Sequence, residues 1–559
     1  MALPELYICQ KLNGMTNKEV ASALNRLAKI MELHGENQFR IRNYSAAYIT
    51  VRKLPFEVFS KEKEELEAIK GIGKSTASKI IELKETGGID AFNQYAEKTP
   101  DGILEMLDIK GLGPKKIRTV WKDMGIESPG ELLYACSENR LLELKGFGPK
   151  TQSHLREQLI YFLDSKGKYL YGHILDEAEE LMDRLQNQFP HHEFEYIGEF
   201  RRKMPIVNGI EIITTLPKSE WQEKFESWDD TAHFQDTATF KHINVQILTC
   251  EKEKMAQTLF EQSCSTEFLQ TFQKNFSSEN MSTEEEFFTN NGLAHIPPEA
   301  RDLALSLELA RNGAGLDIIE DGDIKGVIHT HSTWSDGINS IEEMAKACMD
   351  KGYEYLVMSD HSKAAFYANG LTEDRVLAQM DEIERLNDQL EGFTIFKSIE
   401  CDILSDGRLD YGDDFLSHFD LVIASIHSNL KMDEDKAMNR LLNAIKNEHT
   451  RILGHPTGRL LLSRPGYPVD HQVVIDSCAE HDVVIELNAN PYRLDLDWTW
   501  IPYAIEKGVQ IAINPDAHSI KGIDDIRHGV SVARKALLHK KSCLNCKSAV
   551  EFGRWINNS

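Results

Sequence analysis

From residue 326 onward, the chain alternates short β-rich runs with longer stretches that have the spacing of amphipathic helices. Two of those helical stretches are Ser340–Gly352 and Glu373–Leu390. Strands that alternate with helices predict βα units and a parallel sheet, and a barrel is the simplest closed form of such a sheet. The predicted strands, enough for a distorted barrel, are Gly326–Ile328, Tyr355–Met358, Thr394–Ser398, Leu421–Ala424, Arg451–Leu453, Val483–Ile485 and Gln510–Ala512.

Three segments in the N-terminal part share the pattern apolar–Lys–Gly–apolar–Gly, and helical patterns lie on both sides of each. Each segment therefore predicts a helix, a tight glycine turn and a second helix. Glycines let backbone amides approach a phosphate closely, and the following helix adds its positive N-terminal end. A plain turn would not require the repeated lysine, so DNA binding is the favoured interpretation. The candidate DNA-binding residues in these segments are Lys70, Gly71, Gly73, Lys74, Lys110, Gly111, Gly113, Lys115, Lys145, Gly146, Gly148 and Lys150.

The net charge of −26 disfavours a nucleic-acid partner at first sight, because phosphate contacts need cations. Its distribution changes this conclusion: residues 1–168 hold 26 Lys and Arg against 23 Asp and Glu, whereas the rest of the chain carries −29. DNA contacts are therefore expected to begin in the N-terminal part.

The cysteines and the hydropathy indicate a cellular compartment. The nine Cys residues are scattered, which fits a reducing cytosol, and the C-x-x-C pair Cys543 and Cys546 is interpreted as incidental. No signal-peptide pattern and no apolar run of membrane-spanning length are found in the sequence. We therefore expect a soluble cytoplasmic protein without membrane contact.

Histidines and acids follow most of the predicted barrel strands. Barrel enzymes carry their chemistry at the carboxyl ends of the strands, so residues distant in sequence converge there. A single His-x-His is often only a pair of strand histidines, but a His or an acid after six of the seven strands favours a metal site. The candidate metal ligands are His329, His331, Asp336, His361, Glu400, His427, His455, Asp516 and His518.

The spacing of these residues resembles the PHP phosphoesterase family, from His329-Thr330-His331 and Ser335-Asp336-Gly337 to Asn514-Pro515-Asp516-Ala517-His518. The resemblance covers the whole C-terminal domain. It implies three divalent metal ions with Glu400 as the bridging carboxylate, and imidazole with carboxylate suits Mn²⁺, Zn²⁺ or Fe²⁺. Such ions activate water and neutralise charge on a phosphate. Arginines can clamp the phosphate, and the candidate catalytic arginines after barrel strands are Arg459, Arg464 and Arg493.

The N-terminal part resembles the helix-hairpin-helix region of family X DNA polymerases. The segment Asn37–Tyr44 looks like that family's Phe-Arg-x-Arg-x-Tyr helix, so Arg40, Arg42 and Tyr44 are expected to present cations and a ring to a DNA end. The alternative is a solvated amphipathic helix. Lys79 falls at the position of the family's Schiff-base lysine, which makes it a lyase candidate, although a helix-surface Lys is usually only solvated.

The middle of the chain resembles the palm and thumb of the same family but lacks the catalytic carboxylates. Gly209, Glu211 and Gln246 stand where the family has three aspartates, and Glu199 stands where it has a Ser. One carboxylate and one neutral amide cannot build the oxygen-rich two-metal site that nucleotidyl transfer needs. The segment Ile197–Arg202 stands where the family has its Gly-Ser-x-x-Arg-Arg motif. The resemblance therefore implies a palm that has lost its catalytic residues and no templated polymerase activity.

Together these observations predict a multidomain chain with an α-helical helix-hairpin-helix N-terminal region, an α+β nucleotidyltransferase-like palm and thumb, and an α/β C-terminal PHP barrel of (β/α)7 type. The expected function is a metal-dependent DNA phosphodiesterase for repair, a 3′-5′ exonuclease or an abasic-site endonuclease, acting on gapped duplexes or 3′ ends. A phosphatase acting on a small phosphomonoester, a gap-filling polymerase with a differently aligned palm, and a non-catalytic scaffold are the alternatives. The predicted domains are 1–92 (lyase-like), 93–168 (fingers-like), 169–258 (palm), 259–315 (thumb), 316–323 (linker) and 324–559 (PHP).

Overall fold

The chain forms two compact units in a computed structural model. The first unit contains residues 1–136 and 141–160, and the second contains residues 137–140 and 161–559. The structure describes residues 15–54, 56–109, 111–164, 167–228, 230–234, 237–241, 243–278, 281–311 and 315–557. This division does not test the finer domain boundaries expected from the sequence.

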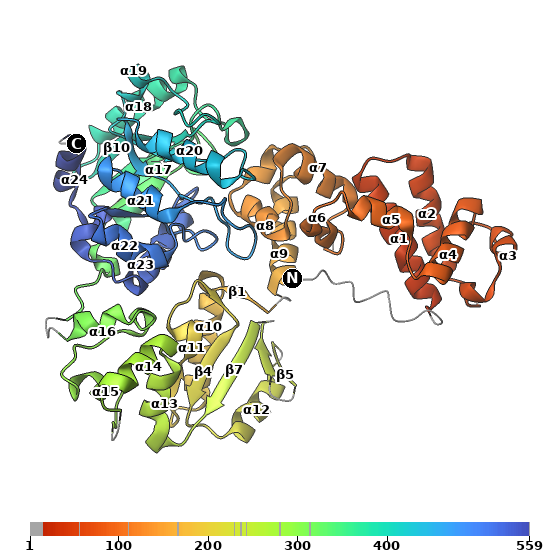
Figure 1. Ribbon diagram of the computed structural model, residues 1–559, viewed down its shortest axis with the longest axis horizontal. Helices are drawn as coiled ribbons and strands as arrows, with labels where there is room; N and C mark the ends of the chain where they lie inside the picture. Colours follow the sequence, from red (N-terminus) through yellow and green to blue (C-terminus); the bar gives the residue numbers. More distant parts are fainter. Residues whose placement is uncertain are drawn as a thin grey trace. The chain divides into compact units, whose positions relative to one another are not determined.

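The first unit is helical in its described part (Figure 1). Helix α1 begins with a capping box in which Thr16 and Glu19 satisfy each other's backbone amides. Its apolar face packs on α2 around a core that includes Leu24, Leu27 and Ile41. The helices are α1 (Asn17–Leu33), α2 (Gln38–Val51), α3 (Lys63–Glu67), α4 (Lys74–Thr86), α5 (Asp90–Ala96), α6 (Asp101–Met106), α7 (Pro114–Met124), α8 (Pro129–Ser137) and α9 (Pro149–Asp164).

The part of the second unit that was predicted as a palm contains a mixed five-stranded sheet in the order β2-β4-β7-β6-β5. Strands β4 and β7 are parallel, with Glu211 opposite Gln246. Its elements are β1 (Tyr169–Leu170), α10 (Leu175–Gln188), β2 (Phe194–Tyr196), α11 (Gly198–Arg201), β3 (Ile206–Val207), β4 (Ile210–Thr214), α12 (Lys218–Ser227), β5 (Thr231–Phe234), β6 (Thr237–Phe240) and β7 (Ile243–Thr249).

The thumb-like region packs short helices around phenylalanine rings. Phe260 stacks on Phe287 with ring centroids 4.1 Å apart. The predicted linker that follows is anchored rather than free, because Ile319 is fully buried and its amide donates to the Leu538 carbonyl at 2.9 Å. Residues 312–314, at the end of the predicted thumb, lie outside the described residues. The helices are α13 (Met255–Gln262), α14 (Thr266–Asn275), α15 (Glu286–Thr289) and α16 (Leu305–Ala310).

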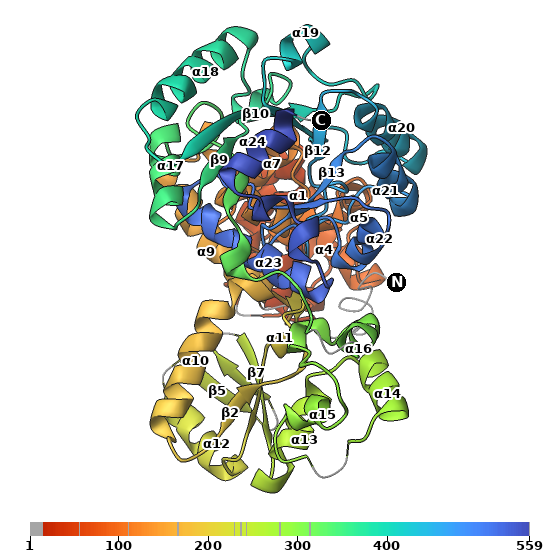
Figure 2. The same ribbon diagram turned by 90° about the vertical axis from the view of Figure 1, so that its left-hand side faces the viewer.

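The C-terminal part is a parallel sheet of seven strands in the sequential order β8 to β14. Helices surround the strands, as Figure 2 shows for α17, α18, α20, α21 and α22. The strands are β8 (Gly326–Thr330), β9 (Tyr355–Met358), β10 (Thr394–Asp402), β11 (Leu421–Ser425), β12 (Thr450–Leu453), β13 (Val484–Asn488) and β14 (Ile511–Asn514). The helices are α17 (Ile341–Asp350), α18 (Glu373–Asn387), α19 (Asp413–Leu416), α20 (Glu434–Ile445), α21 (His471–Glu480), α22 (Ile501–Glu506), α23 (Ile526–Lys535) and α24 (Ala549–Asn557).

Backbone hydrogen bonds join the first and the last strand at one end of the barrel. The His331 amide donates to the Ala517 carbonyl at 2.9 Å, and the Ala517 amide donates to the His329 carbonyl at 3.3 Å. Thr330 and Ala517 form the corresponding parallel bridge. This seam nearly closes the sheet, so the residues that follow β8 and β14 lie side by side.

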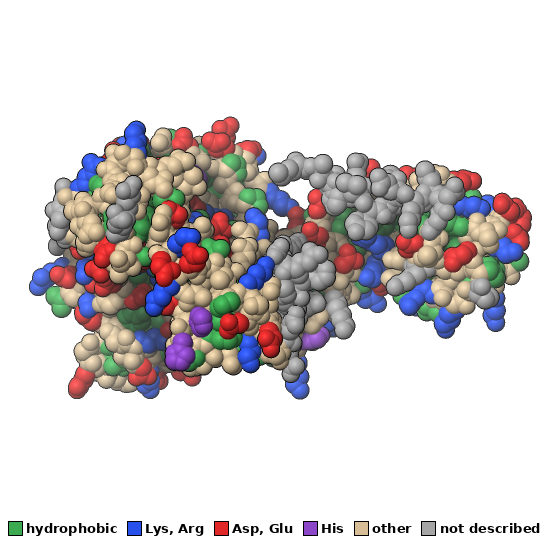
Figure 3. All heavy atoms as spheres, turned by 90° about the horizontal axis from the view of Figure 1, so that it is seen from below, with side chains coloured by type: hydrophobic (Ala, Val, Ile, Leu, Met, Phe, Trp, Pro, Cys, Tyr) green, Lys and Arg blue, Asp and Glu red, His purple; other side chains and the backbone are tan. Residues whose placement is uncertain are grey.

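The surface carries mixed charge on the face that Figure 3 shows, where acidic and basic side chains are interspersed. The net charge of the chain is therefore not gathered into one large acidic patch on that face. Among the described helices, none combines the length and the apolar character needed to cross a bilayer.

A buried ion cluster ties the palm, the thumb and the barrel together. Lys535 of α23 is fully buried, and its ammonium group pairs with Asp302 of the thumb. Arg202 of the palm pairs with the same carboxylate at 3.1 Å. Burial lowers the pKa of Lys535 and Asp302 acts to raise it. Asp302 is thus the common partner of two cations.

Replacing Asp302 by Ala should destabilise the second unit by about 3–5 kcal/mol, because the Lys535 ammonium would stay buried without its partner. Urea unfolding followed by tryptophan fluorescence measures this change. The exposed Glu308→Ala variant serves as the control and should shift the unfolding free energy by less than about 0.5 kcal/mol. Equal stability of the two variants would contradict the assigned role of Asp302.

Candidate metal centre and nucleic-acid interface

The structure brings the predicted metal ligands together at the carboxyl end of the barrel. These ligands lie on or directly after six of the seven strands, and β13 is the strand that contributes none of them. Most are almost completely buried, while Asp336 and His427 are slightly more exposed. The set consists of His329, His331, Asp336, His361, Glu400, His427, His455, Asp516 and His518.

The Glu400 carboxylate lies at the centre of this cluster. Its Oε1 atom faces the Nε2 atoms of His329, His427 and His455 at 3.2, 3.0 and 2.9 Å. Its Oε2 atom lies 2.8 Å from His361 Nδ1 and 3.8 Å from His331 Nε2. The two oxygens thus face two different sets of imidazoles. This is the arrangement expected of a carboxylate that bridges two cations.

Two aspartates complete the cluster on either side of His331. Asp516 Oδ1 lies 3.0 Å from His331 Nε2, and Asp336 Oδ1 lies 3.9 Å from His331 Nδ1. Asp336 also lies 3.4 Å from His518 Nε2. In the described residues, three overlapping groups have donor atoms close enough for one cation each: His331, Asp336, His361 and His518; His329, His331 and Asp516; His361, Glu400 and His427.

The unsatisfied polar atoms of the cluster fit bound cations. His329 Nε2 and His331 Nδ1 are buried and have no hydrogen-bond partner in the described structure. Burying such groups without partners is costly, and divalent ions would satisfy them. Burial, together with His518 and His361, lowers the pKa of His331 to about 4, so this imidazole is neutral and able to donate a lone pair at neutral pH.

The electrostatics also keep the central carboxylate ionised. Burial is the largest single influence on the pKa of Glu400 and acts to raise it, but His427, His329 and His361 together hold it well below its usual range. Glu400 therefore carries the negative charge that a bridging ligand needs.

The backbone is strained at two of the candidate ligands. His329 and Asp516 have φ values of +65° and +53°, a region that residues other than glycine rarely adopt. Such conformations persist only where the surrounding structure holds them, and they cluster at functional sites. Both residues lie at the β8–β14 seam, so closure of the barrel and orientation of the ligands are coupled.

Glu486 of β13 is a site residue that sequence reasoning missed. It is fully buried and lies 2.6 Å from His329 Nδ1, on the side of the ring away from Glu400. It also accepts hydrogen bonds from the His455 amide at 3.0 Å and from Asn514 Nδ2 at 2.8 Å. A carboxylate behind a ligating imidazole fixes the tautomer and the orientation of the ring. An acid within an apolar strand was the available signal, but the predicted strand ended at Ile485.

Asp360 holds the loop that carries Asp336. This buried carboxylate accepts from the Ser332 amide at 2.8 Å, the Ser335 amide at 3.1 Å and Gln379 Nε2 at 2.5 Å. The loop is therefore fixed by the segment after β9, which also carries His361.

The three candidate arginines differ in position. Arg493 Nε lies 3.6 Å from Asp516 Oδ2, at the edge of the cluster. Arg459 pairs with Asp497 at 2.5 Å and donates to the Arg493 carbonyl at 2.9 Å, so it braces that loop. Arg464 donates to the Gly458 carbonyl at 2.9 Å. Arg493 thus contacts a candidate metal ligand.

The carboxylates at the predicted palm positions bond to neighbouring groups of the palm. Glu211 Oε2 accepts from the Phe200 amide at 3.2 Å, at the start of α11. A side chain at residue 198 would meet the Glu211 carboxylate, because a Cβ atom there would lie 2.2 Å from Glu211 Oε1. Glu199 accepts from Asn208 Nδ2 at 3.0 Å. Burial raises the pKa of Glu211, and the Phe200 amide acts to lower it.

Both arginines of the palm motif are held in ion pairs. Arg201 binds Glu284 through two bonds of 2.6 and 2.7 Å, and Arg202 binds Asp302. Burial acts to raise the pKa of Glu284, but Arg201 and Arg301 hold it at about 2. The palm and the thumb are thus joined through the guanidinium groups of this motif.

The three glycine turns of the first unit have the same local geometry. The first glycine of each has a positive φ, with +100° at Gly71, +85° at Gly111 and +97° at Gly146, where glycine alone fits without strain. Gly73 and Gly113 are N-caps of α4 and α7. The apolar residue between the glycines is buried, and the flanking lysines Lys70, Lys74, Lys115, Lys145 and Lys150 are exposed. Lys110 lies outside the described residues.

The expected role of Tyr44 does not agree with the structure. Its ring is 2% exposed in the core, and its hydroxyl lies 2.9 Å from Ser75 Oγ, so it cannot stack on DNA in this conformation. Arg40 and Tyr44 are four residues apart, so the sequence predicts that they share one face of the helix. The spacing alone does not predict which face of the helix is buried. Arg40 and Arg42 are exposed. Lys79 pairs with Glu82 at 2.5 Å on α4.

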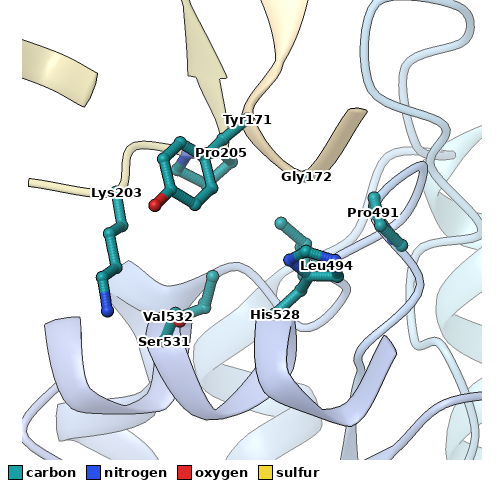
Figure 4. A pocket seen from close by; sticks show the side chains of 9 residues that line it. All are labelled: Tyr171, Gly172, Lys203, Pro205, Pro491, Leu494, His528, Ser531 and Val532. Carbon is teal, nitrogen blue, oxygen red and sulfur yellow. The ribbon is translucent and has the colours of Figure 1, made fainter. Parts of the chain in front are cut away.

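A pocket in the second unit lies apart from the ligand cluster (Figure 4). The His528 ring of α23 lies close beneath Gly172, where a Cβ atom would be 2.8 Å from His528 Cε1. Burial, with Arg527 and Lys203, lowers the pKa of His528 to about 4. Since no candidate ligand lines this pocket, it is separate from the metal centre. Its lining residues are Tyr171, Gly172, Lys203, Pro205, Pro491, Leu494, His528, Ser531 and Val532.

A near-closed parallel barrel of the PHP type, in one chain with helix-hairpin-helix segments, defines a multidomain DNA-associated enzyme. Residues 15–89 match the helix-hairpin-helix domain family, and residues 103–159 match the SAM-like helix-hairpin-helix tandem family. The chain belongs to the bacterial family X DNA polymerases with a C-terminal PHP domain. It is 34% identical to "DNA polymerase/3'-5' exonuclease PolX" of Bacillus subtilis (strain 168), over 98% of this chain and 100% of that protein.

The C-terminal part is also similar to shorter proteins named "Probable phosphatase". One from Thermoanaerobacter sp. (strain X514) is 28% identical over 39% of this chain and 88% of its own length. Another from Shewanella sp. (strain MR-4) is 26% identical over 39% of this chain and 85% of its own length. These matches and the structure confirm the predicted fold class.

Replacing Glu486 by Ala should weaken metal binding by roughly 10- to 100-fold, because His329 would lose the partner that orients its ring. Elemental analysis after dialysis against a metal buffer measures the bound ions per chain. Glu486→Gln should lose less, since the amide oxygen still accepts a hydrogen bond. The exposed Glu391→Ala variant is the matched control, and equal metal content in all four proteins would refute the role of Glu486.

Proposed function

We propose that the chain is a metal-dependent DNA phosphodiesterase that removes nucleotides from 3′ ends during DNA repair in the cytoplasm. The observation that carries this proposal is the buried Glu400 carboxylate, which has five imidazoles around it at the carboxyl end of the barrel. Family membership supports it, since the Bacillus relative is named as a polymerase and 3′-5′ exonuclease.

The proposed centre holds three divalent ions, Mn²⁺, Zn²⁺ or Fe²⁺, which lower the pKa of water and neutralise charge on the phosphate when bound. The chain's own residues prepare the site. Glu400 supplies an ionised bridge, and His331 stays neutral at physiological pH. Glu486 orients His329, and Arg493 offers a guanidinium at the edge of the cluster. An abasic-site endonuclease would use the same groups on an internal phosphodiester.

Delivery of DNA is assigned to the helix-hairpin-helix segments. Their glycine turns are open: a Cβ atom at Gly73, Gly113 or Gly148 would meet nothing within 4 Å. Exposed lysines flank them, so a phosphate can approach the backbone amides at the start of the following helix. These features support gapped duplexes or free 3′ ends as substrates, because sequence-independent phosphate contacts suit any DNA end.

The proposal includes a palm without polymerase activity. Gly209 and Gln246 offer no carboxylate, and Glu211 bonds to the α11 amides instead of pointing to an open metal site. The ion pairs of Arg201 and Arg202 further support a structural role for this motif. Two-metal nucleotidyl transfer lacks its ligands in such a palm.

A phosphatase acting on small phosphomonoesters is the second candidate. The observation that favours it is the similarity of the C-terminal part to proteins named "Probable phosphatase". The same metal chemistry would hydrolyse a phosphomonoester or a phosphodiester. The helix-hairpin-helix segments of the first unit are therefore the feature that favours DNA over a small substrate.

A 5′-labelled primer strand in a gapped duplex should be shortened from its 3′ end in the presence of Mn²⁺, because the metal centre would cleave successive phosphodiesters. Denaturing gels follow the ladder of products. His329→Ala should lower the rate by at least about 100-fold, since it removes a ligand. Release of phosphate from 4-nitrophenyl phosphate without any DNA ladder would favour the phosphatase instead.

The same gapped duplex supplied with all four deoxynucleoside triphosphates should show no extended primer. This assay is best done with the His329→Ala variant, because that variant would not degrade an extended primer by exonuclease activity. A primer lengthened by one or more nucleotides would contradict the proposed loss of polymerase activity.

A further inference from the structure

An aromatic side chain stands in the solvent next to the metal centre. Phe366 opens the short 3₁₀ helix η7 (Phe366–Ala368), on the loop that follows His361. It is 85% exposed, the highest exposure among the large apolar side chains that the structure describes. Single exposed apolar residues are common, so exposure alone is no evidence of a function. The position of Phe366 near the metal centre is the evidence that indicates a function for it.

Ring contacts connect Phe366 to a candidate metal ligand. The rings of Phe366 and Tyr367 have centroids 6.1 Å apart, and the rings of Tyr367 and His361 have centroids 6.5 Å apart. Tyr367 therefore stands between the exposed ring and the metal centre. A nucleotide whose phosphate is at the cluster would have its sugar and base within reach of this row of rings.

The turn that carries Phe366 is rigidly held. The Ala365 amide donates to the Ser362 carbonyl at 3.0 Å, and Arg375 donates to the Asn369 carbonyl at 2.8 Å. Gly370 packs so closely on this turn that a Cβ atom there would lie 1.9 Å from the Ser362 oxygen. The ring is thus presented by fixed backbone, as a preorganised binding surface requires.

The loop that carries Asp336 holds a second exposed apolar residue, and the Asn369 side chain of the Phe366 turn donates to the Trp334 carbonyl of this loop at 3.2 Å. Ile338 is 54% exposed, and its amide donates to the His518 carbonyl at 3.0 Å. Exposed apolar groups therefore lie on two neighbouring loops beside a centre suited to phosphate. An ionic centre with an aromatic platform beside it matches an unpaired nucleotide, in which the phosphate carries charge and the base has a free face.

We propose that Phe366 stacks on the base of the unpaired 3′-terminal nucleotide and holds its phosphodiester at the metal centre. The inference rests on the proposed function and deepens it, because it makes a frayed or single-stranded 3′ end the preferred substrate. A base inside a duplex already stacks on its neighbours, so it offers no free face to Phe366.

Phe366→Ala should raise KM for a single-stranded oligonucleotide by roughly 5- to 150-fold, the range that loss of one base–aromatic stack gives. The kcat for bis(4-nitrophenyl) phosphate, a small diester without a base, should stay unchanged with Mn²⁺. Phe366→Trp should restore the KM. The control is Val550→Ala on α24, which is 63% exposed. Phe552 of the same helix stacks on Tyr355, the first residue of β9, so this helix lies at the end of the barrel away from the ligands.

A substrate with an abasic site as its 3′-terminal nucleotide provides the matched test. Wild-type protein should lose affinity for it by about the same factor as Phe366→Ala loses on normal DNA, and the variant should not distinguish the two substrates. If wild type degrades DNA and Phe366→Ala does so with unchanged KM, the stacking role is refuted while the proposed function stands. If wild type cleaves only the small diester, the proposed function fails and the inference fails with it.

Discussion

The buried Glu400 carboxylate and the imidazoles around it are the interaction on which the rest of the structure depends. Five imidazoles face its two oxygens inside a protein core, where unpartnered polar groups are costly. Bound cations would remove that cost and would supply the chemistry of the cluster. The seam between β8 and β14 makes the arrangement possible, because it brings the two ends of the barrel sequence together. His329 and Asp516 adopt strained backbone conformations at this seam, so the fold stabilises the site and the bound ions would stabilise the fold.

In the palm, the strands keep their pairing while Glu211, at a position expected to be catalytic, bonds to the protein backbone. The β4 and β7 strands retain the parallel pairing that sets Glu211 opposite Gln246. The Glu211 carboxylate bonds to a backbone amide at the start of α11, and Arg202 shares Asp302 with Lys535 of the barrel. Groups placed where the family binds nucleotides thus connect the palm to the thumb and the barrel.

The sequence predicted the barrel and the convergence of polar residues at one end of it, since polar residues directly after apolar strands have few alternatives to a position there. Glu486 was missed because it lies inside a strand whose predicted end came one position too early, and an inward-facing acid in a strand has no spacing signature. Tyr44 was misjudged for a different reason. A helical period groups residues on one face, but only tertiary packing decides that Ile41 and Tyr44 lie in the core while Arg40 stays outside. Contacts such as Lys535 with Asp302 join distant segments and leave no local pattern.

The most direct test of the metal centre is anomalous diffraction from crystals of the full-length protein grown with Mn²⁺. The account predicts anomalous peaks at about 2.0–2.3 Å from the oxygens of Glu400 and the facing imidazole nitrogens, with more than one peak sharing the carboxylate. An ordered Glu400 that bonds only to protonated histidines, with no anomalous peak around it in crystals of active protein, would contradict the account.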